Sequence, residues 1–551
     1  MSSPDLTSIL AYHDGTKHHF HRFARSSGSL DWASQPNPFR SFAGAPAIAL
    51  HPRPDAPPVS GASSPLTAVL VGDVLRHSLG LSAWKQFGRS RWSLRVNPSS
   101  GNLHPTEAYV VAGPIAGLSQ TPAVYHYSPD RHALEQRCVF EPAAWADAAC
   151  PERHRGPGTA VERVAIWLIA LTSIHWREAW KYGERAFRYC QHDLGHAIAA
   201  VRIAAGMAGW RAAMLPDWSQ RDIAALVGVD RDEDYVEAER EEPGCLLAVG
   251  HESFVVGRDT LLDAARKGRW TGRASQLSDD HVQWTFIDDI ARATQDPGRA
   301  IPPIRLPIQI TNPITNPITR LPDHPMTRLH DRDLVLRRRS AVALDGRSSI
   351  DAVRFFAMLS RTMPDGGPPW DALWWDARIH LALFVHRVDG VAPGLYLLAR
   401  NPQAIDRLRE ACGRKFQWER ASETLPLFAL AGGNCRPVAQ RVSCDQEIAA
   451  DGFFSLGMIA DFDASLHTFG PTFYRHLFWE SGVVGQVLYL EAEAAGSRGT
   501  GIGCFYDDPV HDVLGLTGHA FQSLYHFTVG MPVEDTRLTT EPGYPWETTR
   551  T

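Results

Sequence analysis

Several features that mark other classes of protein are missing from this 551-residue chain. It has no run of about 18 apolar residues, so no membrane span is expected. Its first residues, Met1 to Leu6, lack the basic and apolar regions of a secretory signal. Its eight cysteines include no CxxC pair, which suits a reducing cytoplasm and argues against a disulfide framework or a structural zinc site. The net charge of −6 does not favour nucleic acid as a partner.

The chain contains an internal repeat at a constant offset of 287 positions. Gly183-x3-Phe187-Arg188-x6-Gly195 corresponds to Gly470-x3-Tyr474-Arg475-x6-Gly482 without a gap. The same offset relates Gly209 to Gly496, and residues 223–229 to residues 510–516. Two long copies indicate a duplicated domain rather than a repeat array. A duplicated domain on one chain is a covalent version of a two-fold dimer.

The repeat and the proline content divide the chain into three parts. We expect a first domain over residues 1–265 and a second over residues 334–551. Between them, residues 266–333 are predicted to form a helix and a Pro-rich linker, because each proline fixes φ and removes a donor. Hydrophobic patterning predicts helices over residues 66–81, 186–209, 349–359 and 473–493, and strands over residues 108–112, 164–171, 380–386, 394–398 and 521–530.

The histidine-rich segment from Tyr12 to Arg22 admits two interpretations, a metal cluster or a solvated first helix or loop. No set of carboxylates or cysteines joins it at ligand spacing, so the solvated segment is favoured and no metal site is predicted.

Four segments could bind a ligand, although each also has an ordinary structural explanation. The turn Pro98–Asn102 is rich in backbone and hydroxyl donors, but such turns often simply precede a strand. The triplet Arg337–Arg339 and the following Ser340 could bind phosphate, or form a solvated face. The glycines of Gly499–Asp508 could let backbone N–H groups approach a ligand. Arg537 is a second candidate for phosphate, or a surface arginine on a tail.

Lys181 and Tyr182 form a candidate catalytic pair just before the long helix of the first copy. A lysine near apolar tryptophans can act as a general base when it is desolvated. The alternative is an exposed lysine at a helix terminus.

Together these segments resemble the nitroreductase superfamily, and within it the SagB-type or ThcOx flavin dehydrogenases. The resemblance implies an α+β fold in which two units, each an essentially antiparallel sheet wrapped by helices, form an intimate dimer with FMN at the interface. It implies that Lys181 and Tyr182 are catalytic. The residues that it implies for FMN binding are Pro98, Ser99, Ser100, Gly101, Asn102, Arg337, Arg338, Arg339, Ser340, Gly501, Ile502, Gly503, Cys504 and Arg537. Many relatives have a second basic residue at the position of Val342.

The two copies have diverged unequally, which predicts one FMN per chain. Trp210–Asp217 replaces the glycine segment in the first copy, and Trp370–Ala377 replaces the Pro-Ser-Ser turn in the second. The intact elements therefore combine into one site, and the mirror-image site is expected to be lost.

The resemblance implies an FMN-dependent dehydrogenase or oxidase that acts on a small-molecule or peptide substrate, such as an azoline in a modified peptide. Two alternatives remain open. One is an NAD(P)H-dependent reductase of nitroaromatics or quinones, which would need no general base. The other is a flavin-free scaffold subunit of a peptide-modifying complex. We expect a cytoplasmic protein that binds neither nucleic acid nor membrane.

Overall fold

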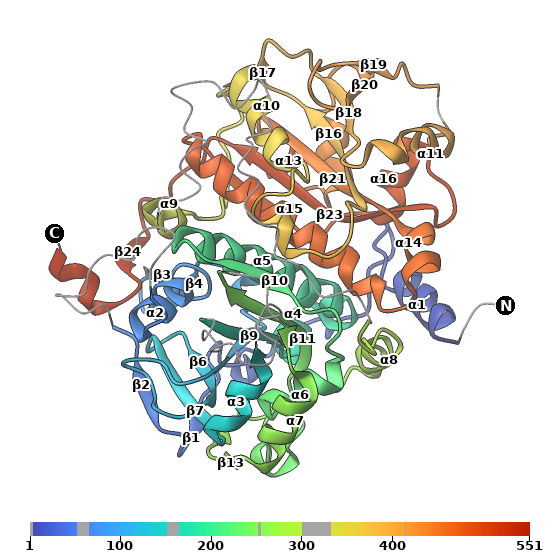
Figure 1. The fold of residues 1–551 in the computed structure, drawn as a ribbon. Helices are drawn as coiled ribbons and strands as arrows, with labels where there is room; N and C mark the ends of the chain where they lie inside the picture. The colour runs from blue at the N-terminus through green and yellow to red at the C-terminus, as the bar shows by residue number, and fades with distance from the viewer. Residues whose placement is uncertain are drawn as a thin grey trace.

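The computed structural model describes residues 4–51, 65–150, 165–251, 255–299, 332–413 and 415–550. The chain forms two α+β units that face each other across two long helices, α5 (Ala186–Met207) and α15 (Phe473–Ala494) (Figure 1). Each long helix lies between its own sheet and the other unit. The predicted fold class is therefore confirmed. Most of the predicted Pro-rich linker, from residue 300 to residue 331, lies outside the described residues.

The sheet of the first unit has the strand order β10-β11-β9-β5-β6-β7-β13, and β2 also pairs with β7. Every pairing in it is antiparallel. Its strands are β2 (Ala47–Ala49), β5 (Thr106–Ala112), β6 (Ala123–Ser128), β7 (Ala133–Val139), β9 (Ile166–Ser173), β10 (Arg211–Met214), β11 (Glu242–Gly250) and β13 (Arg269–Trp270).

The second unit repeats this topology with the order β19-β20-β18-β16-β21-β23-β22, again wholly antiparallel. Its strands are β16 (Ile379–Val385), β18 (Gly394–Leu398), β19 (Glu419–Arg420), β20 (Leu427–Gly432), β21 (Phe454–Asp461), β22 (Arg498–Ile502) and β23 (Phe521–Gly530). Read from β22 inward, six strands take the places of β10, β11, β9, β5, β6 and β7. Strands β16 and β18, both of which the sequence predicts, pair as antiparallel neighbours.

The offset of the sequence repeat also relates the helices. The pairs α4 (His175–Tyr182) and α14 (Phe462–Phe469), α5 and α15, and α6 (Gln220–Val227) and α16 (Asp507–Leu514) begin and end at residues related by the same offset. Gly228 and Gly515 end α6 and α16 in the left-handed conformation, with φ of 74° and 71°. A side chain is disfavoured at such a C-cap, so both copies keep glycine there.

The two long helices cross at a pair of repeat-related glycines, Gly195 and Gly482. A Cβ on Gly195 would overlap the backbone carbonyl of Trp479, and a Cβ on Gly482 would overlap that of His192 and lie 2.9 Å from the Cα of Gly195. Only hydrogen fits on both sides of this crossing, because backbone cannot move aside as a flexible side chain can. The glycines allow the helices to pack with their backbones in contact.

The other helices pack either against the long helices or on the outer faces of the sheets, and short strand pairs join the loops. The helices are α2 (Ala68–Arg76), α3 (Pro142–Ala148), α7 (Arg258–Lys267), α8 (Thr285–Ala293), α9 (Arg332–Arg337), α10 (Ala352–Arg361), α11 (Ile405–Ala411), α12 (Arg436–Val442) and α13 (Ile448–Asp451). The short pairs are β1 (Phe42–Ala43) with β14 (Arg273–Ala274), β8 (Ala149–Cys150) with β12 (Val255–Val256), and β15 (Ile350–Asp351) with β17 (Val388–Asp389).

Both ends of the chain contact the opposite unit. The N-terminal helix α1 (Pro4–Gly15) brings His13 against Tyr474 and Gln522 of the second unit. The prediction of a solvated segment is wrong here, since Tyr12 and His13 are fully buried. At the other end, β24 (Thr539–Pro542) follows β23 and adds to the hairpin of β3 (Leu81–Phe87) and β4 (Ser90–Arg95). Residues 521–530 form a strand as predicted, but β24 follows it, so it is not the final strand as we expected.

Candidate functional site

A cavity of about 490 Å³ lies where the two units meet, and both units form its wall. The first unit contributes the turn Pro98–Asn102, Tyr182, Tyr189, Asp193 and His196, and the second contributes residues 338–342, Tyr489, residues 500–504, Tyr525 and residues 532–535. Its size falls within the range of about 300–1,000 Å³ that small-molecule and cofactor sites occupy. Most of the ligand-binding segments predicted from the sequence therefore share one space.

The turn Pro98–Asn102 is held against the long helix of its own unit. The backbone N–H and the hydroxyl of Ser100 donate to the carboxylate of Asp193, over 3.0–3.2 Å. Gly101 and Asn102 have φ of 59° and 60°. A Cβ on Gly101 would lie 2.6 Å from the hydroxyl of Tyr182, so a side chain does not fit at this position. All five residues of the turn line the cavity.

Cationic side chains gather at one end of the cavity. Arg338 is buried, donates to the carbonyl of Arg95, and leaves its Nε and Nη1 atoms without a hydrogen-bond partner among the described residues. The described hydrogen bonds of Arg339 all go to backbone carbonyls. Burial and the neighbouring Arg338 lower the pKa of Arg339 to about 10. Two adjacent guanidiniums, of which Arg338 has unused donors, favour an anionic group in this part of the cavity.

The glycine segment and strand β22 form the part of the wall beside the arginines, where the N–H of Ala341 donates to the carbonyl of Gly499 over 3.1 Å. The N–H of Gly501 donates to the hydroxyl of Tyr489 over 2.9 Å, and the hydroxyl of Ser340 donates to the same oxygen over 3.0 Å. A Cβ on Gly501 would overlap the hydroxyl of Tyr525, and one on Gly503 would lie 2.5 Å from the ring of Tyr189. The absence of side chains here lets the tyrosines lie flat against the strand, so the cavity keeps its width.

The candidate catalytic pair lies at the C-terminal end of α4, behind the turn. Tyr182 lines the cavity, whereas Lys181 lies beside Gly101 and places its Nζ 5.2 Å from the centre of the Tyr182 ring. Burial raises the pKa of Tyr182 well above its ordinary value, and the charge of Glu178 adds to this effect. The phenol therefore keeps its proton and can serve as a hydrogen-bond donor.

A buried pair of carboxyl groups, Glu178 and Asp193, supports the turn, and the sequence analysis missed it. Burial raises the pKa of Asp193 to about 8, although the hydrogen bonds from Ser100 oppose the shift. Burial and the charge of Asp193 raise the pKa of Glu178 as well. Two like charges in a buried site cannot readily both ionise, so the pair retains a proton near neutral pH. An acidic residue on the buried face of a predicted central helix was the signal available in the sequence.

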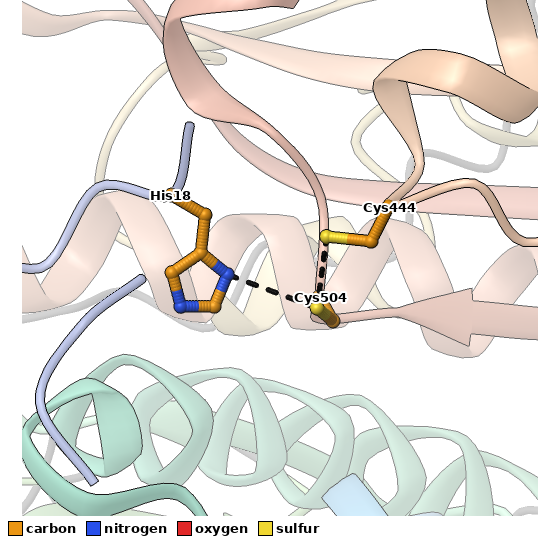
Figure 2. A group of neighbouring side chains, drawn as sticks. All are labelled: His18, Cys444 and Cys504. Carbon is orange, nitrogen blue, oxygen red and sulfur yellow. Dashed lines mark hydrogen bonds between the residues drawn. The ribbon is translucent and has the colours of Figure 1, made fainter. Parts of the chain in front are cut away.

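Cys504 lies at the end of the glycine segment and contacts two further side chains. Its Sγ is 2.9 Å from the Sγ of Cys444 and 3.7 Å from Nδ1 of His18 (Figure 2). The hydrogen bond with Cys444 lowers the pKa of Cys504 to about 5, against the effect of burial, and His18 and Arg185 add to the lowering. Cys504 is the member of this group that lines the cavity.

Two predicted arginines lie outside the cavity wall. Arg337 ends α9 and is exposed. Arg537 has a side chain that is 72% exposed, and it pairs with Asp535. Val342, where the resemblance leads us to expect a basic residue, lies along the cavity and is exposed. The side chain of Arg498 lines the cavity and pairs with Glu534 over 2.6 Å.

The repeat-related positions on the other side are filled by side chains. Glu480 corresponds to Asp193, and it accepts hydrogen bonds from the indole of Trp375 and from the backbone N–H groups of Arg378 and Ile379. Arg202 corresponds to Tyr489 and pairs with Asp371 over 2.7 Å. Trp375 therefore bonds Glu480 in the second unit, as Ser100 of the turn bonds Asp193 in the first.

Comparisons with known proteins identify the class of fold. Residues 78–251 match the model of the Nitroreductase family. The protein named "Putative nitroreductase MJ1384" from Methanocaldococcus jannaschii is 24% identical over 194 residues, which cover 34% of this chain and 83% of that protein. A crystal structure described as a putative nitroreductase from Anabaena variabilis is 23% identical, with a TM-score of 0.68 over 96% of this chain and 99% of that one.

Residues 78–251 therefore match a nitroreductase-family domain, and the class of fold that the comparisons define is that of the nitroreductases. The likeness to the Anabaena structure covers nearly all of both chains, so it extends to the fold of both units. Within the described residues, no helix is long and apolar enough to cross a membrane.

Proposed function

We propose that this protein is an FMN-dependent oxidoreductase of the SagB type, a dehydrogenase or oxidase, with one FMN in the cavity between its two units. The observation that carries the proposal is the composite wall. The serine turn Pro98–Asn102 comes from one unit, and the arginines at 338 and 339 and the glycine segment 501–504 come from the other. Neither unit supplies the complete set.

The residues present fit FMN in charge and in shape. The unused donors of Arg338 and the neighbouring guanidinium of Arg339 suit a phosphate dianion. Tyr489 and Tyr525 provide aromatic and hydroxyl groups beside the strand. Gly101 and Gly501 keep the cavity wide enough for a flat ring, because a side chain on either would meet a tyrosine hydroxyl. The turn adds polar groups that can bond the edge of such a ring.

When it is bound, FMN supplies the hydride chemistry of such an enzyme. The protein's own residues would transfer a proton and orient the substrate. Lys181 would accept a proton from a substrate carbon, and Tyr182, which keeps its own proton, would donate a hydrogen bond that orients the substrate. The substrate class that suits this pair is an azoline or a similar C–N or C–C single bond in a peptide-derived or small molecule.

The composite cavity also supports one flavin per chain. The repeat-related region has Trp375 on Glu480 and the ion pair of Arg202 with Asp371, where the cavity has Ser100 on Asp193 and Tyr489. These side chains occupy the space that a second flavin ring would need.

Cofactor extraction from the purified protein tests the proposal. We expect FMN at one equivalent per chain, and an Arg338→Ala variant that binds it at least about tenfold more weakly, the loss of one charge-assisted contact. A folded, colourless protein that takes up no added FMN would refute the cofactor assignment. Two equivalents per chain would refute the single site.

Turnover then tests the pair that was assigned to proton transfer. Lys181→Ala is expected to keep one FMN and to lose about 10²–10⁴-fold in the rate of flavin reduction by an azoline peptide under anaerobic conditions, as for loss of a general base. Lys267→Ala, an exposed lysine on α7, is the control. Full turnover of the Lys181 variant, together with rapid reduction by NADH or NADPH, would favour a nitro or quinone reductase instead.

A further inference from the structure

Three side chains that can bind a metal ion meet at the boundary between the two units. They are His18, which follows α1, Cys444, which follows α12, and Cys504 in the glycine segment. Their ligand atoms all lie within 4.8 Å of one another, and the imidazole of His18 and the thiol of Cys444 both point toward the thiol of Cys504 (Figure 2). The three ligands come from segments that are far apart in the sequence, so the tertiary fold brings them together.

The group is held in place by its surroundings. The backbone N–H of His18 donates to the buried carboxylate of Asp507 over 2.8 Å, and that carboxylate also binds Arg185. The side chain of Gln446 donates to the carbonyl of Cys504 over 2.9 Å. His18 itself is 7% exposed. These contacts fix the backbone on two of the three sides, so the donor atoms are organised before any ion binds.

The types of ligand select the ion. Two thiolates and an imidazole favour Zn²⁺ over Mg²⁺ or Ca²⁺, which prefer oxygen. Zinc binds sulfur at about 2.3 Å and nitrogen at about 2.0–2.1 Å, which holds two sulfurs roughly 3.8 Å apart in a tetrahedral site. The distance of 3.7 Å between the Sγ of Cys504 and the Nδ1 of His18 already fits such a site. The sulfurs of Cys444 and Cys504, 2.9 Å apart, must separate by a small side-chain rotation.

We propose that His18, Cys444 and Cys504 bind one Zn²⁺ ion. The ion links the N-terminal segment of the first unit to the second unit, beside the cavity. Within the described residues the group supplies three donor atoms, which leaves a fourth position for water or for a ligand that enters from the cavity. Cys504 also belongs to the cavity wall proposed for the flavin, so the test variants are made at Cys444 and His18, which lie outside that wall.

Metal content and Co²⁺ spectroscopy test the site in the full chain. The protein is reduced, treated with a chelator, and titrated first with Zn²⁺ and then, in a separate sample, with Co²⁺. We expect one equivalent of Zn²⁺ by mass spectrometry, and with Co²⁺ the intense visible bands of a tetrahedral thiolate site. Cys444→Ser and His18→Ala should each bind Zn²⁺ more than about 100-fold more weakly, a greater loss than removal of an outer-shell group causes.

Cys435→Ser is the matched control, because this cysteine is the N-cap residue of α12, only nine positions before Cys444, and lies outside the group. It should retain the full metal content. Thermal melts of the variants without metal show whether each one folds, and a folded Cys444→Ser variant with unchanged Zn²⁺ affinity would overturn the site. A reduced wild-type protein that binds no Zn²⁺, with Cys444 and Cys504 joined as a disulfide after exposure to air, would overturn it as well.

Discussion

At the scale of single residues, the site depends on a buried carboxyl pair, of which Asp193 lines the cavity and holds the turn Pro98–Asn102. Asp193 accepts two hydrogen bonds from Ser100, and Glu178 lies behind it on α4. Neither carboxyl group has an arginine in a salt bridge among the described residues, and burial raises the pKa of both. The pair holds the turn without placing a full negative charge on each carboxyl group beside the cavity.

The raised pKa of Asp193 makes the stability of the fold depend on pH. The folded group has a pKa of about 8 and its ordinary value is 3.8, so between these values the folded state binds a proton that the unfolded state does not. Stability is therefore complete below about pH 4 for this group and falls as the pH rises to about 8, by about 1.4 kcal/mol per pH unit for one proton. Asp193→Asn should remove this slope.

Urea unfolding of the wild type and of Asp193→Asn between pH 5 and pH 8 measures this effect, at about one point per half pH unit. As the pH rises, the free energy of unfolding of the wild type should fall relative to that of the variant. Parallel curves for the two proteins would show that Asp193 titrates normally.

Gly501 offers a second test, because a methyl group there would displace the Tyr525 hydroxyl into the cavity. Gly501→Ala is expected to weaken FMN binding by about tenfold or more, the cost of an overpacked contact of 1–3 kcal/mol. Gly432→Ala on β20 is the control, since a Cβ there meets no atom within 4 Å. Equal FMN affinity in the two variants, measured by fluorescence quenching, would show that the ring does not lie against Gly501.

Residue types and spacing predicted which segments form the site, but they did not predict which individual side chains contact the cavity. The triplet at 337–339 was predicted as a unit, yet Arg337 ends α9 and points to solvent while Arg338 lines the cavity. Whether an arginine of the triplet faces the cavity or the solvent depends on a shift of one position, and the sequence does not show where α9 ends. The group at His18 was missed for another reason. Its cysteines lie more than 400 positions away, so no ligand spacing links them in the sequence.

At the scale of elements, the long helices were predictable and their contact was not. The Ala-rich pattern predicts a central helix over residues 186–209, and the structure ends it at Met207. The repeat places Gly195 and Gly482 at equivalent positions, but a sequence repeat does not show that the two glycines face each other. Strand β24 was missed because its four residues alternate little and pair only with the distant β3.

The crossing of α5 and α15 predicts opposite effects for two glycine substitutions on one helix. Gly195→Ala should destabilise the protein by at least about 2 kcal/mol, because its methyl group would overlap the Trp479 backbone. Gly206→Ala meets only the flexible end of Arg202, at 3.1 Å, and should be neutral or stabilising by up to about 1 kcal/mol through helix propensity. Thermal melts distinguish them, and equal melting temperatures would contradict the close crossing.

At the scale of the whole molecule, the two units are joined by exchanged ends as well as by the central helices. The C-terminal segment of the second unit crosses to the first, where β24 pairs with β3. Just before β24, residues 532–535 form part of the cavity wall. The wall is therefore held between β23, in the sheet of one unit, and β24, on the hairpin of the other (Figure 1). Loss of the contacts that anchor this tail, the C-terminal segment after β23, should therefore lower the stability of the fold and loosen the cavity wall at residues 532–535.

Tyr544 is the anchor of that tail and gives the most direct test of this arrangement. Its hydroxyl donates to the carbonyl of Pro129 over 2.7 Å and accepts from the N–H of Leu81 over 2.9 Å, and its ring stacks on Trp546. Tyr544→Ala should cost about 3–5 kcal/mol, as for loss of a buried aromatic ring. FMN should then dissociate faster, because the wall at 532–535 is no longer held at its C-terminal end.

Tyr544→Phe separates the ring from the hydroxyl. It keeps the stacking and leaves the Leu81 N–H and the Pro129 carbonyl unpaired, which should cost about 1–3 kcal/mol and alter FMN release less than the alanine variant does. The stability of each variant comes from thermal melts, and the rate of FMN release comes from the recovery of flavin fluorescence on dilution. If Tyr544→Ala lowered the melting temperature and left FMN release unchanged, the cavity wall would be independent of the tail. The exchanged strand would then stabilise the molecule without shaping its site.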